Sequence, residues 1–186
     1  MSFSQHYHDE ESRREWQNPE KILKQIGVKE GHTFVDVGCG KGFFSMPAAR
    51  IVGPSGKVIG IDINERAVRD LQERSKEENL TNASFEVVRA EDAKACEGCA
   101  DFVFFGIDLH DFDDPQKVLQ NARGMLKSSG KLVDLDWKKK IMRKGPPVWM
   151  RLRVDEAAEL IEGAGFRIES IGDSGKMHYM IIARPK

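Results

Sequence analysis

Three things are scarce in this sequence: cysteine, long apolar runs and a surplus of charge of either sign. Three cysteines in 186 residues are too few for a disulfide framework, which makes a reducing cytoplasm the simplest location. No run approaches the roughly 18 apolar residues of a membrane-spanning helix, and the polar first residues argue against a signal peptide. With 29 basic and 30 acidic residues, the charge balance does not demand a nucleic-acid partner.

What the sequence does have is a regular alternation of short apolar runs and helical patterns. Strands are predicted at 33–37, 57–61, 83–88, 101–105, 131–137, 166–171 and 176–183, and helices at about 43–52, 65–78, 115–127 and 155–163, with turn signals at 53–56, 128–130 and 172–175. This order predicts an α/β, Rossmann-like fold. We expect a mainly parallel sheet of seven strands with helices on both faces and a C-terminal antiparallel hairpin strand. One domain is expected over 1–186, with an N-terminal helical extension or lid over 1–30 and the core over 31–186.

A glycine-rich turn follows the first predicted strand, where residues 35–42 read Val-Asp-Val-Gly-Cys-Gly-Lys-Gly. Gly38, Gly40 and Gly42 let the backbone turn sharply and approach a ligand closely. Asp36 distinguishes between two classes of cofactor that bind at such a turn. A carboxylate opposes the pyrophosphate of a nicotinamide cofactor, but it suits the ammonium and sulfonium of S-adenosylmethionine. A nicotinamide-dependent oxidoreductase therefore explains the sheet but not Asp36.

A second acidic residue, Asp62, ends the second predicted strand in Gly-Ile-Asp-Ile. A carboxylate at that strand end can accept hydrogen bonds from both hydroxyls of a ribose. The alternative is that Asp62 caps the following helix, a role for which Asn64 is better placed. We therefore interpret Asp62 as a nucleoside ligand.

With these residues in place, the chain resembles the class I S-adenosylmethionine-dependent methyltransferases, in particular the ubiquinone/menaquinone C-methyltransferase group. The resemblance covers nearly the whole chain. Residues 35–42 resemble the first family motif, 61–62 the second, 89–93 the acidic loop after the third strand, 104–110 the segment after the fourth strand, and 126–132 the turn into the fifth.

The resemblance implies a set of cofactor contacts, which are Asp36, Gly38, Cys39, Gly40, Gly42, Asp62, Ile63, Glu91, Asp92, Phe105 and Gly106. Within the set, the glycine turn holds the amino-acid end and Cys39 contributes its backbone. Either Glu91 or Asp92 could contact the adenine, while Phe105 and Gly106 lie beside the transferable methyl group. The expected product is S-adenosylhomocysteine.

His110, just after the fourth predicted strand, is the candidate general base, because a neutral imidazole accepts a proton near pH 7. Asp108 and Asp111 flank His110 and could orient its ring or bind a polar acceptor. The alternatives are that His110 only shapes the pocket and that Asp108 is a loop residue bonded to its own backbone.

The methyl acceptor is expected to be a small molecule, methylated on oxygen, carbon or nitrogen. An RNA or protein acceptor is the alternative within the same chemistry, although nucleic acid is not indicated. Methyltransferases that act on exocyclic amines of nucleic acids have an Asn/Asp-Pro-Pro-aromatic motif after the fourth strand. Residues 106–109 read Gly-Ile-Asp-Leu instead, which disfavours adenine N6 and cytosine N4 as targets. From another class, a catalytically silent cofactor-binding subunit needs no acceptor pocket.

Cys96 and Cys99 form a Cys-x-x-Cys that can bind zinc, cycle through a disulfide or hold a soft metalloid. Zinc would need two more ligands and no second cysteine pair exists, so no metal site is predicted. The simplest interpretation is two small loop residues.

Two segments outside the motifs could shape an acceptor pocket. Trp16 could close the site or simply pack a helix against the sheet. The basic loop 138–144, with Arg151 and Arg153 after it, would suit an anionic acceptor or an RNA phosphate if it is not a solvated charge run. Trp149 and Met150 could line an acceptor pocket.

Overall fold

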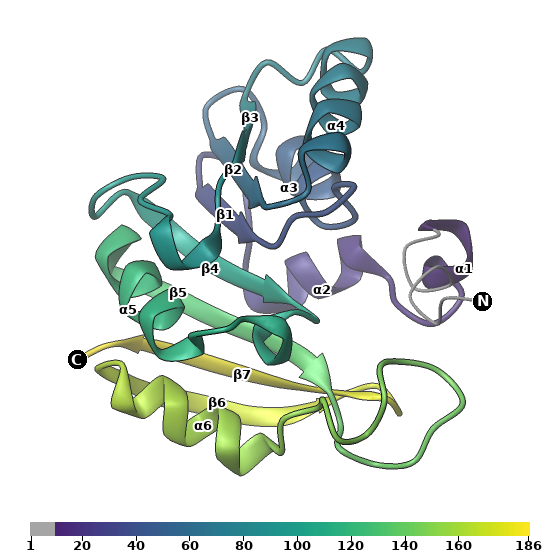
Figure 1. Ribbon diagram of the computed structural model, residues 1–186. Coiled ribbons are helices and arrows are strands. Elements are labelled where there is room, and N and C mark those ends of the chain that lie inside the picture. The colour runs from purple at the N-terminus through teal and green to yellow at the C-terminus, as the bar shows by residue number, and fades with distance from the viewer. Residues whose placement is uncertain (1–9) are drawn as a thin grey trace.

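A seven-stranded sheet forms the centre of the computed structural model, which describes residues 10–186 (Figure 1). The first nine residues of the predicted 1–30 extension lie outside the described part. The strands are β1 (Thr33–Val37), β2 (Lys57–Asp62), β3 (Ala83–Val87), β4 (Ala100–Gly106), β5 (Leu126–Trp137), β6 (Phe166–Ser174) and β7 (His178–Pro185). Their order is β3-β2-β1-β4-β5-β7-β6, with β7 inserted antiparallel between β5 and β6. The predicted fold class is confirmed.

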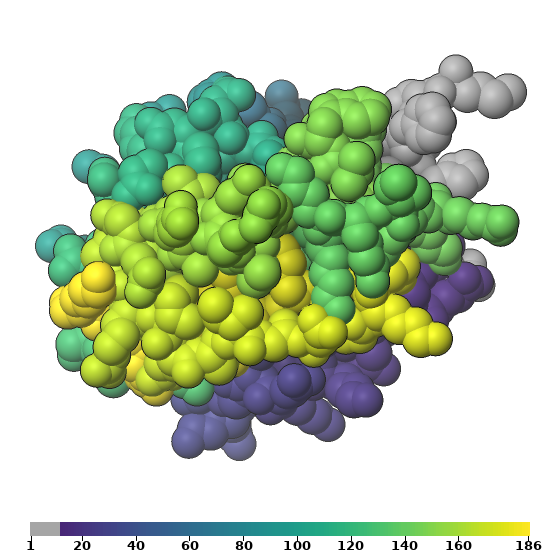
Figure 2. Space-filling model, turned by 90° about the horizontal axis from the view of Figure 1, so that it is seen from below, coloured from purple at the N-terminus to yellow at the C-terminus, as the bar shows by residue number. Residues whose placement is uncertain are grey.

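Helices cover both faces of the sheet. They are α1 (Glu10–Arg14), α2 (Pro19–Ile26), α3 (Ser45–Val52), α4 (Glu65–Glu77), α5 (Pro115–Met125) and α6 (Val154–Gly163), with short 3₁₀ helices η2 (Ala90–Asp92) and η3 (Leu109–Asp111). Buried side chains of α2 and α3 form one apolar cluster with the sheet, and those of α5 and α6 form another on the opposite face. In the view from below, α6 and the β6–β7 hairpin make up most of the surface, beside the loop after β5 (Figure 2).

The helix starts follow the capping residues in the sequence. The side chains of Asn18, Asn64 and Asp114 accept hydrogen bonds from backbone N–H groups in the first turns of α2, α4 and α5. Each satisfies a donor that has no partner within its helix. The longest of these described helices, α4, has 13 residues, and none is long and apolar enough to cross a membrane.

Two of the predicted turns differ from the structure. The break predicted at 128–130 is part of β5, which begins at Leu126 and pairs with Ala100. Gly130 serves close packing, since a Cβ there would lie 2.7 Å from the Ala100 carbonyl oxygen. The hairpin turn predicted at 172–175 is displaced, because β6 continues to Ser174. Glycine signalled a close approach in the first case, which sequence patterns do not distinguish from a turn.

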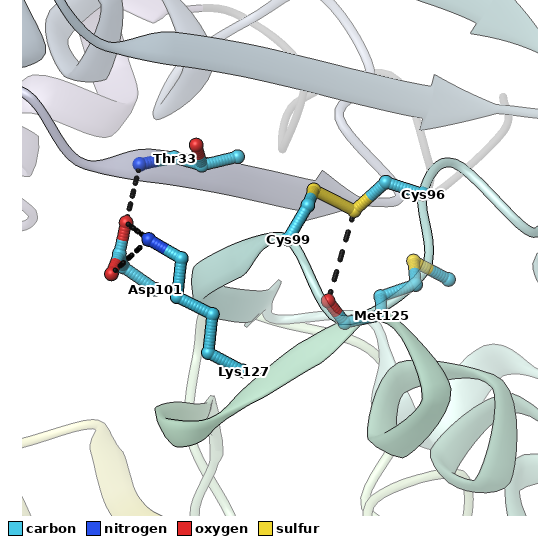
Figure 3. The surroundings of a disulfide bond; sticks show 6 residues. All are labelled: Thr33, Cys96, Cys99, Asp101, Met125 and Lys127. Carbon is cyan, nitrogen blue, oxygen red and sulfur yellow. Dashed lines mark hydrogen bonds and ion pairs between the residues drawn. A yellow bond between two sulfur atoms is a disulfide. The ribbon is translucent and has the colours of Figure 1, made fainter.

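A disulfide joins Cys96 to Cys99 just before β4, so the interpretation as plain loop residues is wrong (Figure 3). The Cys96 sulfur lies 3.7 Å from the Met125 carbonyl oxygen at the end of α5. Beside it, the Lys127 ammonium lies 2.8 Å from Asp101, which joins the start of β5 to the start of β4. The disulfide therefore lies where β4 begins, at the opposite end of that strand from its carboxyl end.

The strand order changes direction at β1 and β4. From β1 the chain proceeds outward through β2 and β3, and it then returns to place β4 on the other side of β1. Ligands of such sheets bind in the crevice at the carboxyl ends of the strands at this point. Here the two strands end at Val37 and Gly106.

Candidate functional site

A pocket of about 690 Å³ lies at the carboxyl ends of the central strands. Most of the predicted site residues line it, namely Gly38, Cys39, Gly40, Asp62, Ile63, Glu91, Gly106, Asp108 and His110. Four others, Asp36, Gly42, Asp92 and Phe105, do not. Phe105 belongs to the buried core beneath, where β4 packs against α5. Nine of the predicted site residues thus line one pocket, and four lie outside its lining.

The three glycines of the turn differ in what a side chain at each position would contact. A Cβ at Gly38 would lie 2.2 Å from the Asp108 carboxylate, and one at Gly42 would lie 2.4 Å from a methyl group of Leu71. These two glycines let other side chains pack against the turn. A Cβ at Gly40, by contrast, would meet no atom within 4 Å. The backbone at Gly40 therefore faces open pocket, as a turn that holds a ligand against its main chain requires.

Asp62 is fixed against this turn. Its two carboxylate oxygens accept hydrogen bonds from the backbone N–H groups of Gly40 at 2.7 Å and Asn64 at 2.8 Å. Each oxygen keeps a lone pair for another donor. The helix cap is supplied by Asn64, whose side chain accepts from the Ala67 N–H at 3.1 Å. Asp62 is therefore a pre-oriented, acceptor-only group at the pocket wall, beside the exposed apolar side chain of Ile63.

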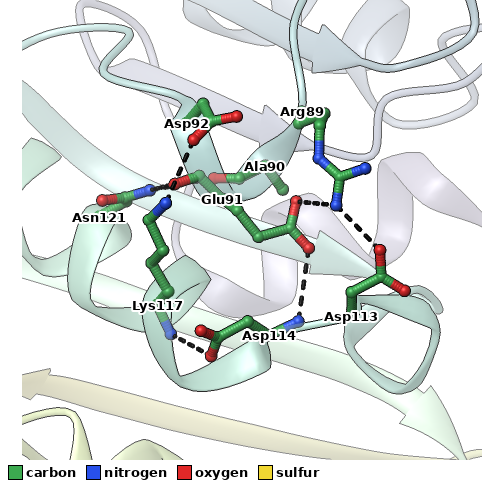
Figure 4. A network of polar contacts seen from close by, with 8 residues as sticks. All are labelled: Arg89, Ala90, Glu91, Asp92, Asp113, Asp114, Lys117 and Asn121. Carbon is green, nitrogen blue, oxygen red and sulfur yellow. Dashed lines mark hydrogen bonds and ion pairs between the residues drawn. The ribbon is translucent and has the colours of Figure 1, made fainter.

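The structure separates Glu91 from Asp92 (Figure 4). Glu91 is buried at the pocket wall, with its carboxylate 3.5 Å from the Arg89 guanidinium. Asp92 instead pairs with Lys117 of α5 at 3.2 Å, and its side chain is mostly exposed. The Asn121 side chain donates to the Glu91 carbonyl oxygen at 2.8 Å and holds the loop in place. Of the two alternatives, only Glu91 is available to a ligand.

Asp36 lies beneath the turn rather than in the pocket wall. Its carboxylate is buried and accepts a hydrogen bond of 2.5 Å from the Ser45 hydroxyl of α3. Burial raises the pKa of Asp36 to about 7, although the Ser45 hydrogen bond and the charge of Arg13 oppose the shift. Asp36 can therefore act on a ligand through its charge but not by direct contact, which corrects the sequence expectation.

Asp108 is the least satisfied polar side chain of the site. Both of its carboxylate oxygens are buried, and neither has a hydrogen-bond partner within residues 10–186. The proposed bond to its own backbone is thus absent. Burial, followed by the nearby charges of Asp36 and Asp136, raises the pKa of Asp108 well above its ordinary value.

His110 is oriented by a residue that the sequence did not single out. Its Nδ1 lies 2.8 Å from one Asp136 carboxylate oxygen and 2.9 Å from the other. Because a carboxylate only accepts, Nδ1 carries the proton and the lone pair of the neutral ring is on Nε2. Nε2 lies 3.3 Å from Asp111. Burial alone would lower the pKa of His110, but the bond to Asp136 and the charges of Asp136 and Asp111 raise it.

An apolar wall forms part of the pocket lining. It consists of Phe43, Trp137, Pro146, Pro147 and Met150, and the Arg13 guanidinium lies over the Phe43 ring at 4.0 Å. Phe112 also lines the pocket, next to Asp113, which pairs with Arg89. Trp16 packs on the outer side of this wall, with its ring 5.3 Å from that of Trp137. The packing alternative for Trp16 is the one observed. Trp149 is 77% exposed and lies outside the pocket, contrary to expectation.

The basic loop is used for structure rather than for a ligand. Arg151 is buried and donates to the carbonyl oxygens of Lys138, Lys140, Lys144 and Pro146 at 2.8–3.2 Å. The lysines lie outside the pocket, whose basic lining within the described chain consists of Arg13, Lys41 and Arg89. The expectation that the loop charges face an acceptor is therefore wrong for this conformation.

Comparison with known proteins agrees with this geometry. The methyltransferase domain family matches residues 28–180. A crystal structure of a SAM-dependent methyltransferase from Aquifex aeolicus superposes with a TM-score of 0.91 at 32% identity, covering 98% of both chains. Among curated relatives, the ubiquinone/menaquinone biosynthesis C-methyltransferase of Pasteurella multocida is 32% identical over 62% of this chain and 44% of its own length. The demethylmenaquinone methyltransferase of Staphylococcus carnosus is 29% identical over 73% and 52%.

The chain thus spans about half the length of these curated relatives, and nearly all of the Aquifex protein. The matched region contains the glycine turn, Asp62, Glu91 and the His110 segment. From the family match, the sheet order and the structural likeness together, the chain belongs to the methyltransferase domain family.

Proposed function

We propose that the chain methylates a small aromatic molecule in the pocket between the glycine turn and Trp137. The observation that carries the proposal is the division of one pocket into two chemically different ends. One end has an open main-chain turn and two acidic side chains, Asp62 and Glu91. The other has an oriented histidine and an apolar wall.

At the donor end, the residues present fit S-adenosylmethionine. The open backbone at Gly40 suits the amino-acid portion, Asp62 has spare lone pairs for ribose hydroxyls, and Glu91 can accept from an adenine amino group. When bound, this donor supplies an electrophilic methyl group, and the electron pair of the broken C–S bond stays on sulfur. The remaining chemistry is positioning of the acceptor and removal of its proton.

At the acceptor end, His110 is the general base. Asp136 holds Nδ1–H, so Nε2 receives the proton that the acceptor loses as its new bond to carbon forms. Asp136 and Asp111 then stabilise the imidazolium. Arg13, at the pocket edge, is suited to hold a polar substituent of the acceptor.

The aromatic lining of the pocket and the names of the curated relatives indicate the class of methyl acceptor. Phe43 and Trp137 offer aromatic surface to a planar ring, and the curated relatives are named for quinone biosynthesis and demethylmenaquinone. A hydroxylated aromatic ring, methylated on carbon or oxygen, fits both. The alternative RNA acceptor is less well supported, because the basic loop lies outside the pocket.

The test is a methyl-transfer assay with labelled S-adenosylmethionine and a panel of hydroxylated naphthalenes and benzenes, with RNA and protein pools alongside. We expect label in an aromatic small molecule and none in RNA. Label in RNA or protein alone would overturn the acceptor class. Tight binding of S-adenosylhomocysteine without transfer to any acceptor would favour the catalytically silent subunit.

A further inference from the structure

Four buried carboxylates lie close together under the pocket floor. Asp36 belongs to β1, Asp108 follows β4, and Asp134 and Asp136 belong to β5. Each is coupled electrostatically to at least one other member. Burying so many like charges is costly unless they are neutralised or serve a ligand.

Two of these acids have hydrogen-bond partners, because Asp36 accepts from Ser45 and Asp136 holds His110. The carboxylate oxygens of Asp134 and of Asp108 lack a hydrogen-bond partner within the described chain, and Asp134 lies beside Tyr179 of β7. Asp108 is the member of the four that lines the pocket, directly behind Gly38.

The groups around Asp108 are mostly negative. They are Asp36 on β1, Asp62 at the end of β2, Asp134 and Asp136 on β5, and His110 on η3, while Arg13 of α1 acts on Asp36. The carboxylates raise the pKa of Asp108 further than burial alone, and the pKa of Asp36 lies at about 7. A cation entering the pocket lowers the cost of ionising both groups.

We propose that Asp108, backed by Asp36, is a charge sensor beneath the donor site that favours the cationic methyl donor over its uncharged product. This inference rests on the donor placement proposed above. The donor carries a sulfonium that the product, a thioether, lacks. Because the carboxylate oxygens of Asp108 are buried behind Gly38, Asp108 acts on the ligand through its field, as a positioning residue does, rather than by taking part in the reaction.

Two consequences follow from this arrangement. The site binds the donor better, relative to the product, when Asp108 is ionised, which eases product release after transfer. Donor binding also expels protons from the Asp36–Asp108 pair, whereas product binding expels fewer. The preference for donor over product therefore rises with pH through the range in which these acids ionise.

The experiment is calorimetric titration with S-adenosylmethionine and with S-adenosylhomocysteine, between about pH 6 and pH 7.5 where the ligand amino groups stay mostly protonated. Buffers of different ionisation enthalpy report the protons released. For the wild-type protein we expect more protons released by the donor, and a preference for the donor that rises with pH. Equal proton release for the two ligands would overturn the proposal.

Asp108→Asn keeps the shape and removes the charge. We expect it to weaken donor binding about tenfold, to leave product binding within about twofold, and to reduce the difference in proton release to the share that Asp36 contributes. Asp173→Asn, which removes an exposed charge on the edge strand β6 outside the pocket lining, is the matched control and should leave the affinity for both ligands unchanged. If Asp108→Asn weakens both ligands equally, its role is structural and the proposal fails.

If the donor does not bind where we propose, the binding measurements give a different result. In that case Asp62→Ala would leave both ligands unaffected, whereas the charge sensor predicts nothing about that variant. Should Asp108→Asn not fold, the proton release and pH dependence of the wild-type protein still decide the proposal.

Discussion

The two ends of the pocket are built in different ways. The donor end uses the turn after β1, the last residue of β2 and the short helix η2 after β3, so each contact lies near the strand that positions it. The acceptor end brings together α1, the segment after β4, the end of β5 and the loop that follows (Figure 1). That loop is held by a buried arginine, Arg151, which bonds main-chain carbonyls. A local motif describes the first end, but only the folded chain describes the second.

This difference is expected from how such enzymes diverge. Strand ends in the sheet are rigid and place a common cofactor, whereas loops on a rigid scaffold change with the substrate. Mutations at the donor end should therefore change binding of donor and product. Mutations at the acceptor end should change turnover and leave donor binding intact.

The largest expected effect is at the acceptor end. His110→Ala should lower kcat by about 10²- to 10⁴-fold, because the acceptor proton loses its base. The kcat of Asp136→Asn should lie between those of His110→Ala and the wild-type protein, since the imidazole remains but its orientation is weakened. Both are measured with labelled donor and a saturating acceptor. Unchanged turnover in His110→Ala would remove the base role.

The corresponding change at the donor end is Asp62→Ala. It should weaken both S-adenosylmethionine and S-adenosylhomocysteine about a hundredfold, since bonds to two ribose hydroxyls and the anchoring of Gly40 are lost together. Asp92→Ala is the matched control, because Asp92 pairs with Lys117 outside the pocket. Equal losses in the two variants would contradict the assignment of the pocket wall.

The buried carboxylates beneath the pocket should make the stability of the protein depend on pH. The pKa of Asp36 is raised from 3.8 to about 7 in the folded state, so folding opposes its ionisation. The free energy of unfolding should fall as pH rises between these values and then level off. Asp36→Asn should raise it by about 4 kcal/mol near pH 8 and change it little near pH 4. Thermal or urea unfolding measures this, and equal effects at both pH values would contradict it.

The smallest effect is expected far from both ends. Reducing the disulfide, or changing Cys96 and Cys99 to serine, opens a loop of only a few residues, so stability should fall by about 2 kcal/mol or less. Donor affinity should stay within about twofold of wild type, because the disulfide lies where β4 begins. A large loss of donor affinity on reduction would show that this segment controls the adenine loop.

The sequence allowed the fold and most of the donor end to be predicted because both depend on local patterns. Alternating elements indicate the sheet, and Asp62 is the last residue of its strand. The orientation of His110 was missed, since Asp136 lies 26 residues away and depends on the pairing of β4 with β5. Its signal was an alternation of acids within an apolar strand, Val-Asp-Leu-Asp-Trp. The position of Asp36 beneath the turn was likewise set by packing against Ser45 of α3.

The most direct test of the divided pocket is a crystal structure of the protein with S-adenosylhomocysteine. The account predicts the amino-acid portion at Gly40, the ribose on Asp62, the adenine beside Glu91 and the sulfur facing His110. A ligand whose ribose lies away from Asp62, or whose sulfur faces away from His110, would contradict it.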